Sequence, residues 1–149
     1  MQLSKDLREF VELLNSRKIR YLLVGGHAVA LHGHPRYTGD VDFLIDTSAE
    51  NAALMAEAVA DFGFAGLGLT EADFRATEMV IQLGRPPNRI DILTSVAAVS
   101  FGEAWKTRVE TQLDGLPVWV ISKELLVQNK LAAGRPQDLA DAAKLREID

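Results

Sequence analysis

The sequence contains no cysteine. This absence excludes disulfides, thiolate metal sites and cysteine nucleophiles, so any bound metal must be held by oxygen or histidine ligands. No apolar run approaches the roughly 20 residues that a membrane-spanning helix needs, and residues 1–6 lack the apolar stretch of a signal peptide. We therefore expect a cytoplasmic protein without a membrane partner.

An excess of positive charge is also lacking, since the 21 acidic residues outnumber the 16 Lys and Arg residues and the formal net charge is −5. Surfaces that wrap long nucleic acids are usually basic, so we expect no extended DNA-binding surface. Internal repeats, low-complexity tracts and linkers are lacking too. The 149 residues therefore predict a single domain over residues 1–149, with its core at about 19–93 and a hairpin and helices at about 100–149.

Hydrophobic periodicity predicts a mixed order of helices and strands. The strands are expected at 21–24, 40–45, 79–83, 89–93, 108–113 and 116–121, with turn residues joining the last four into two hairpins. The helices are expected from about 3 to 16, at 28–31, after a Thr47/Glu50 capping box as far as Phe62, around Trp105, at 122–133 and from Pro136 onward, with a loop at 66–68. Hairpins beside helix-connected strands predict an α/β (α+β) fold, a mixed sheet flanked by helices with a C-terminal helical pair.

Two carboxylates share one face of the strand at 40–45. Because side chains alternate along a strand, Asp40 and Asp42 point the same way, about 7 Å apart along the backbone, while Val41 and Phe43 point into the core. Adjacent like charges repel, and a hard divalent cation such as Mg²⁺ relieves that repulsion. The alternative is a solvated strand start.

Two further features could belong to the same site. Gly25 and Gly26 end one strand and open a helix, where glycine lets backbone N–H groups approach a phosphate, although such turns also occur for packing reasons. Asp91 is an acid inside an apolar strand, and it needs a partner if it is buried. If its strand lies beside that of Asp40 and Asp42, the three acids suit a two-metal phosphoryl transfer. The alternative is an outward-facing residue on an edge strand.

These residues resemble the signature of the DNA polymerase β-type nucleotidyltransferase superfamily. The run Leu23–Gly26, thirteen residues, and then Asp40–Phe43 resembles its main motif, and Asp91 resembles its separate third acid. The likeness is strongest to small bacterial members, including aminoglycoside nucleotidyltransferases and abortive-infection or toxin–antitoxin toxins. Arg36, which precedes the main acids, and Lys130, ahead of the last helix, also fit those members.

The resemblance implies a nucleotidyltransferase fold and a role for each residue. Gly25 and Gly26 would hold the triphosphate, and Asp40 and Asp42 would ligate Mg²⁺ or Mn²⁺. Asp91 would complete the metal site and act as the base. Arg36 and Lys130 would contact phosphate, although Arg36 could instead pair with an acid and Lys130 could be a surface lysine. Gly26 stands where several relatives carry serine.

The implied activity is the metal-dependent transfer of a nucleoside monophosphate from a nucleoside triphosphate to a hydroxyl acceptor. An antibiotic, a tRNA end and a protein all remain open as acceptors. The acceptor cleft is either open or completed by a second copy or an antitoxin. The alternative function is a non-catalytic nucleotide-binding or regulatory module in a toxin–antitoxin pair. We do not expect His27, His32 and His34 to form a zinc site, because no matching carboxylates accompany them and exposure is the default for the last two.

Overall fold

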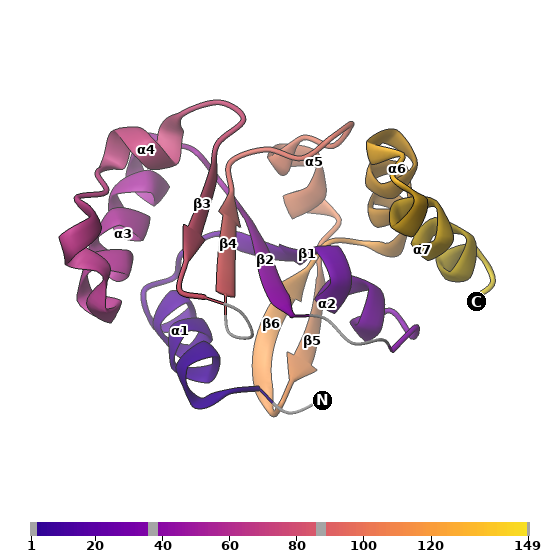
Figure 1. The fold of residues 1–149 in the computed structure, drawn as a ribbon, viewed down its shortest axis with the longest axis horizontal. Helices are drawn as coiled ribbons and strands as arrows, with labels where there is room; N and C mark the ends of the chain where they lie inside the picture. The colour runs from indigo at the N-terminus through magenta and orange to yellow at the C-terminus, as the bar shows by residue number, and fades with distance from the viewer. Residues whose placement is uncertain (1–2, 36–38, 86–88, 149) are drawn as a thin grey trace.

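The computed structural model describes residues 3–35, 39–85 and 89–148, in which helices surround a six-stranded mixed sheet (Figure 1). The sheet has the order β3-β4-β2-β1-β6-β5, and its strands are β1 (Tyr21–Val24), β2 (Asp40–Ile45), β3 (Val80–Leu83), β4 (Arg89–Leu93), β5 (Val109–Leu113) and β6 (Leu116–Val120). The helices are α1 (Lys5–Ser16), α2 (Gly25–Leu31), α3 (Ala49–Val59), α4 (Glu71–Arg75), α5 (Phe101–Lys106), α6 (Lys123–Ala133) and α7 (Pro136–Arg146). The predicted fold class is confirmed.

Strand directions in the sheet are mixed. β2 runs antiparallel to β1 and parallel to β4, while β6 runs parallel to β1. Both predicted hairpins are confirmed, because β3 pairs with β4 and β5 pairs with β6 in antiparallel fashion. In the second hairpin Asp114 and Gly115 have φ angles of 52° and 79°, the positive values that a type I′ turn requires. Residues 86–88, in the first turn, lie outside the described residues.

The main core lies between the sheet and α1. Phe43 of β2 is fully buried, and its ring is contacted edge-on by Phe10 of α1 and by Tyr21 of β1, each at a centroid distance of 5.6 Å. Such edge-on pairs each add about 0.5–1.5 kcal/mol beyond the area that they bury. Because successive side chains on a strand point to opposite faces, Asp40 and Asp42 face away from α1.

The start of α3 corrects one prediction. The capping residue is Ser48, whose hydroxyl accepts a hydrogen bond from the Asn51 N–H and whose backbone is extended, as an N-cap requires. The predicted Thr47/Glu50 capping box is therefore wrong by one residue. The helix ends as predicted near Gly63, where a π-helical turn, Ala60–Phe64, contains this glycine at φ 116°.

The region after this turn is more regular than the predicted loop. A short 3₁₀ helix, Ala65–Leu67, precedes α4, which begins with a capping box between Thr70 and Asp73. Only Phe74 of α4 is buried. A five-residue helix with one buried side chain has too little apolar periodicity to be predicted from sequence.

The predicted C-terminal helical pair is confirmed, and α6 and α7 lie side by side at the far end of the molecule from α3 and α4 (Figure 1). The Ser122 side chain caps α6, Gly134 ends it in the left-handed conformation, and Pro136 is the first residue of α7. Helix α6 also contacts α2, which brings the C-terminal pair beside the glycine turn. Along the described parts of the chain, no helix combines the length and apolarity that a membrane crossing would need.

Candidate active site

Three carboxylates meet on the sheet face opposite α1. Asp42 of β2 pairs in register with Asp91 of β4, and Asp40 pairs with Arg89. Neighbouring strands lie about 4.8 Å apart, and paired residues of parallel strands share a face. Asp91 is 7% exposed and β4 lies between β3 and β2, so Asp91 is not an outward-facing residue of an edge strand. The structure thus brings the predicted acids together.

Arg89 lies among these acids and was not singled out from the sequence. Its Nε donates to Asp91 Oδ1 at 2.8 Å, and its Nη2 lies 2.6 Å from Asp40 Oδ2 and 3.1 Å from Asp91 Oδ2. A usable signal was present, because Arg89 stands two residues before Asp91 on one strand and must share its face.

Gly25 lies against the carboxylate of Asp42. Its φ of +69° is in the left-handed region, and a Cβ at this position would lie 2.1 Å from Asp42 Oδ2. The register explains the proximity, since Val24 pairs with Asp42 and Gly25 follows directly. Only glycine satisfies both the backbone angle and the close approach. The turn that follows β1 is therefore packed directly against the Asp42 carboxylate of β2.

The negative charges of the cluster are incompletely compensated. Burial, reinforced by the charges of Asp91 and Asp40, raises the pKa of Asp42 from 3.8 to about 6, although the cations of Lys130 and Arg89 act in the opposite direction. A carboxylate with a raised pKa beside other acids gains most from an added cation. The donor set therefore fits a hard divalent ion that prefers oxygen ligands. Within the described ranges, no three His, Asp or Glu side chains already surround a common point as a metal cage.

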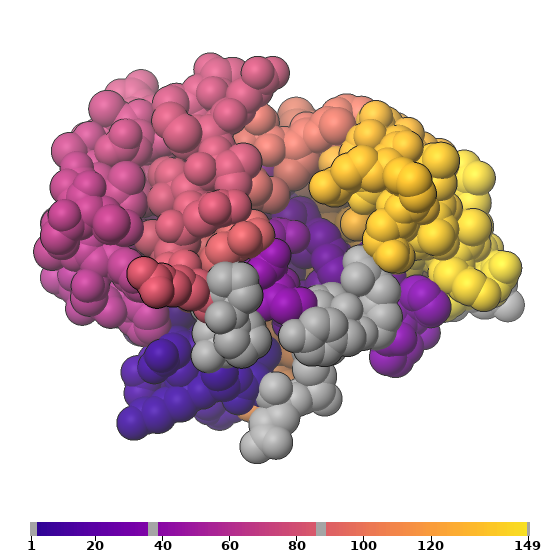
Figure 2. Space-filling view, viewed as in Figure 1, coloured from indigo at the N-terminus to yellow at the C-terminus, as the bar shows by residue number. Residues whose placement is uncertain are grey.

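A cavity of about 400 Å³ opens beside Asp42. Gly25 and Gly26 line one side, and Lys130 and Arg135 from the C-terminal helices line the other. In the space-filling view, purple atoms around α2 and β2 are visible between the pink and red half of the molecule and the yellow C-terminal helices (Figure 2). The volume falls within the range typical of small-molecule sites. The cavity therefore combines backbone donors with two carboxylates, Asp42 and Asp138, and two cations.

Lys130 is not a surface lysine, because it is 6% exposed. Its ammonium lies 3.3 Å from Asp138 and 3.1 Å from Asp141, both of which are almost fully buried. Arg135 donates to Asp138 as well, at 2.7 Å. Burial alone would raise the pKa of Asp138, but its hydrogen bonds to Arg135 and Lys130 hold that pKa below its usual value. Asp138 and Asp141 thus fasten α7 to α6 and also hold Lys130 at the cavity wall.

Arg36, His27 and His32 are three of the remaining polar residues that the sequence analysis considered near the site. Arg36, a predicted phosphate contact, lies outside the described residues. His27 Nδ1 lies 3.1 Å from the Asp40 carbonyl oxygen, and His32 Nε2 lies 2.7 Å from that of Ile121. The expectation that His32 would be simply solvent-exposed is therefore wrong, because the chain folds it onto the end of β6.

Asn129 and Gln137 also line the cavity, and nothing in the sequence distinguished them. The Asn129 amide donates to the Ala97 carbonyl at 3.1 Å, which ties α6 to the segment after β4. The Gln137 amide donates to Asp141 at 2.9 Å. Isolated amide side chains on helices carry no pattern that marks a site, so these contacts emerge only from the packing of α6 and α7.

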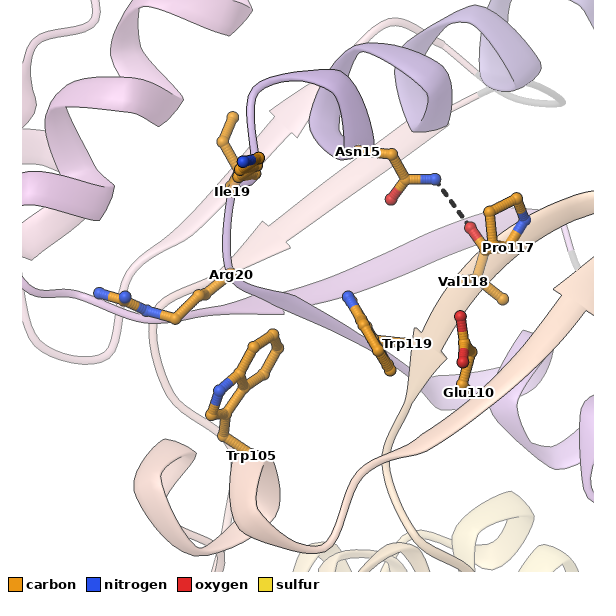
Figure 3. A pocket seen from close by; sticks show the side chains of 9 residues that line it. Asn15, Ile19, Arg20, Trp105, Glu110, Pro117, Val118 and Trp119 are labelled. Atoms are coloured by element: carbon orange, nitrogen blue, oxygen red, sulfur yellow. Dashed lines mark hydrogen bonds between the residues drawn. The ribbon is translucent and has the colours of Figure 1, made fainter.

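A second cavity, of about 360 Å³, lies at the opposite end of β1, where the chain leaves α1. Figure 3 shows Trp105 and Trp119 beside it, with Arg20 on one side and an Asn15 amide that donates to the Pro117 carbonyl at 2.7 Å on the other. The indole rings also contact each other edge-on at 5.9 Å. This cavity has no cluster of carboxylates and lacks the glycine turn, so the candidate chemistry lies in the cavity beside Asp42.

Solved structures place this architecture in a class. A candidate nucleotidyltransferase from Thermotoga maritima (TM1012) has a TM-score of 0.62 at 19% identity, covering 95% of this chain and 88% of that one. The lincomycin-bound lincosamide antibiotic adenylyltransferase LnuA has a TM-score of 0.59 at 19% identity, covering 99% and 98%. An antigenic nucleotidyltransferase-like protein from Paracoccidioides brasiliensis has a TM-score of 0.56 at 21% identity, covering 95% and 76%. The fold is therefore that of the nucleotidyltransferases.

A family model gives the particular assignment. The chain belongs to the family described as "nucleotidyltransferase of unknown function (DUF6036)", whose model matches residues 1–146. A search of curated proteins returned no match. The family confirms the resemblance drawn from the sequence, and it supports a transferase activity with a nucleoside triphosphate as a substrate.

Proposed function

We propose that this protein transfers a nucleoside monophosphate from a nucleoside triphosphate to a hydroxyl acceptor, in a reaction that requires Mg²⁺ or Mn²⁺. One observation carries the proposal: Asp42 lies in register with Asp91 and against Gly25. Asp42 and the glycine turn therefore line one cavity, with Lys130 on its far side, and Asp91 lies beside Asp42 on the same sheet face.

We propose that the three acids bind the metal and that Asp91 also acts as the base. Asp40, Asp42 and Asp91 would hold the divalent ion, which when bound offsets the negative charge of the phosphates and of the leaving group. Asp91 would accept the proton of the acceptor hydroxyl, whose oxygen then forms a bond to the α-phosphorus. The bond between the α-phosphorus and its bridging oxygen to the β-phosphate breaks, and pyrophosphate leaves with both electrons of that bond.

The triphosphate would lie along the wall that carries the glycines and Lys130. Backbone N–H groups of Gly25 and Gly26 can approach phosphate oxygens closely, since neither residue has a side chain. Lys130 acts as a point charge on phosphate, and its position is fixed by Asp138 and Asp141. Arg36 would also contact phosphate.

We propose three chemical classes of acceptor rather than one compound. The neighbour LnuA is an adenylyltransferase of a lincosamide antibiotic and was solved with lincomycin bound. A small antibiotic hydroxyl is therefore one acceptor class, and a tRNA end and a protein hydroxyl are the others. The acceptor cleft is either open or completed by a second copy of the chain or an antitoxin. Consumption of a nucleoside triphosphate suits a cytoplasmic enzyme.

Label transfer tests the proposal directly. The protein is incubated with Mg²⁺ or Mn²⁺, an α-³²P-labelled nucleoside triphosphate and, in separate reactions, lincomycin, an aminoglycoside, total tRNA and protein acceptors. Pyrophosphate release is followed in parallel. The test variant is Asp42→Ala, and the matched control is Asp61→Asn, which removes a carboxylate that pairs with Arg17 at 2.7 Å on the surface.

We expect wild type and Asp61→Asn to transfer label at similar rates and Asp42→Ala to lose at least about a hundredfold in rate, which is the size of effect that loss of a positioned charged group typically has. An Asp42→Ala protein that folds and keeps the wild-type rate would refute the assignment. Heat of nucleotide binding in calorimetry, without pyrophosphate release in the presence of any of these acceptors, would identify a non-catalytic nucleotide-binding module instead.

A further inference from the structure

The guanidinium of Arg89 donates hydrogen bonds to the carboxylate oxygens that would coordinate the proposed metal ion. It engages both oxygens of Asp91 and one oxygen of Asp40. The side chain of Asp91 is 10% exposed and that of Arg89 is 26% exposed, so these contacts are partly shielded from water. Surface ion pairs are worth little, but shielded bidentate pairs are among the stronger charge-assisted hydrogen bonds.

The position of Arg89 follows from the backbone. Arg89 pairs with Asp40 across the β2–β4 ladder, and it shares its strand face with Asp91 because the two residues are two apart. A long cationic side chain at this point therefore projects over both acids. By contrast, Asp42 lies against Gly25 and lines the cavity.

A guanidinium and a divalent cation compete for carboxylate oxygens, because both need the same lone pairs. Mg²⁺ requires near-octahedral oxygen coordination at short distance, which leaves no room for a guanidinium between the same carboxylates. In keeping with this, the described residues include no ready-made trio of acids around a common point, although three acids share one face.

We propose that Arg89 is a built-in counter-cation, which neutralises Asp40 and Asp91 in the metal-free protein and must release at least one of them when the divalent ion binds. This inference rests on the metal site of the proposed function. Arg89 is a positioning residue here, since it acts through the carboxylates. It stabilises the metal-free fold and weakens metal binding by the same contacts, so removal of Arg89 has opposite effects on the two properties. An arginine with a purely structural role would affect stability equally with and without metal.

Mn²⁺ binding provides the test, because free Mn²⁺ is counted by electron paramagnetic resonance without any need for activity. Wild type, Arg89→Gln and Arg89→Lys are titrated with Mn²⁺ alone, and each is melted with a chelator and with saturating Mn²⁺. The matched control is Arg20→Gln, which breaks an arginine–carboxylate pair to Asp46 at 2.6 Å, away from the cavity beside Asp42. Arg89→Lys keeps the charge but loses the bidentate hydrogen bonding. It is therefore the variant to compare with wild type if Arg89→Gln does not fold.

We expect the dissociation constant for Mn²⁺ to fall by about three- to tenfold in Arg89→Gln, and by less in Arg89→Lys. Arg89→Gln should melt below wild type in chelator, and the gap should narrow in saturating Mn²⁺. Arg20→Gln should keep the wild-type dissociation constant and a constant melting gap. If wild type binds Mn²⁺ and the folded Arg89 variants bind it no more tightly than wild type does, this inference is overturned and the proposed function is left intact. No Mn²⁺ binding by any of the proteins would overturn both.

Discussion

Replacing Asp42 by Asn should stabilise the metal-free protein while removing its activity. Asn keeps the size of the side chain beside Gly25 but removes the charge that Asp91 and Asp40 repel. Burial, followed by those two charges, raises the pKa of Asp42 to about 6. The folded protein therefore favours an uncharged group at this position, and Asn supplies one at every pH.

The size and sign of the effect follow from proton linkage. Between about pH 4 and pH 6 folded Asp42 retains a proton that the unfolded chain has released, so the free energy of unfolding falls as the pH rises through this window. Each pH unit between the two pKa values is worth about 1.4 kcal/mol, so a rise from 3.8 to about 6 costs the wild type about 3 kcal/mol above pH 6. At pH 3, below both values, Asp42→Asn should gain nothing from this source.

Urea unfolding followed by circular dichroism measures the difference. At pH 8 in chelator, Asp42→Asn should be more stable than wild type by up to about 3 kcal/mol and should melt roughly 6–12 °C higher. The difference between the two proteins is the quantity to follow, because other acids titrate in both. Mn²⁺ at about 100 times its dissociation constant should stabilise wild type by about 2.7 kcal/mol and close most of the gap.

Two results would refute this reasoning. An Asn variant less stable than wild type at pH 8 in chelator would show that the charge of Asp42 is compensated in the folded protein. A difference that stays constant from pH 3 to pH 8 would show that titration of Asp42 has no part in it. Either result would remove the electrostatic argument that this cluster needs a divalent cation.

Two further substitutions test the glycine turn and the lysine. Gly25→Ala should lower the free energy of unfolding in urea by at least about 2 kcal/mol. The added Cβ would lie 2.1 Å from Asp42 Oδ2, and the backbone at this position has a positive φ, which strains alanine. Gly68→Ala, with φ +66° but nothing within 4 Å, should lose only about 1 kcal/mol, and equal losses would contradict the close approach. Lys130→Met should lose about 3 kcal/mol, because Asp138 and Asp141 stay buried without their shared cation. It should also weaken nucleotide binding in calorimetry, and a fully stable variant would show that these acids do not depend on Lys130.

Local patterns in the sequence determined most of the elements and the type of chemistry. Residues 21–24 form a buried strand because they are a short apolar run that two glycines end. Residues 40–45 show their two faces through the alternation of acidic and apolar side chains. These inferences succeed because strand and helix periods are properties of neighbouring residues.

Only the tertiary structure decided which strands meet and in what register. Residue spacing cannot show that β4 lies beside β2 rather than at an edge, nor that Asp42 faces Asp91 instead of a residue one step away. Those choices depend on how α1, α3 and the sheet pack together. The burial of Lys130 and the placement of Arg89 over the acids arise in the same way, because both depend on contacts between segments distant in the chain. The sequence by itself therefore determined which acids were available, whereas packing decided that they share one face with a cation already among them.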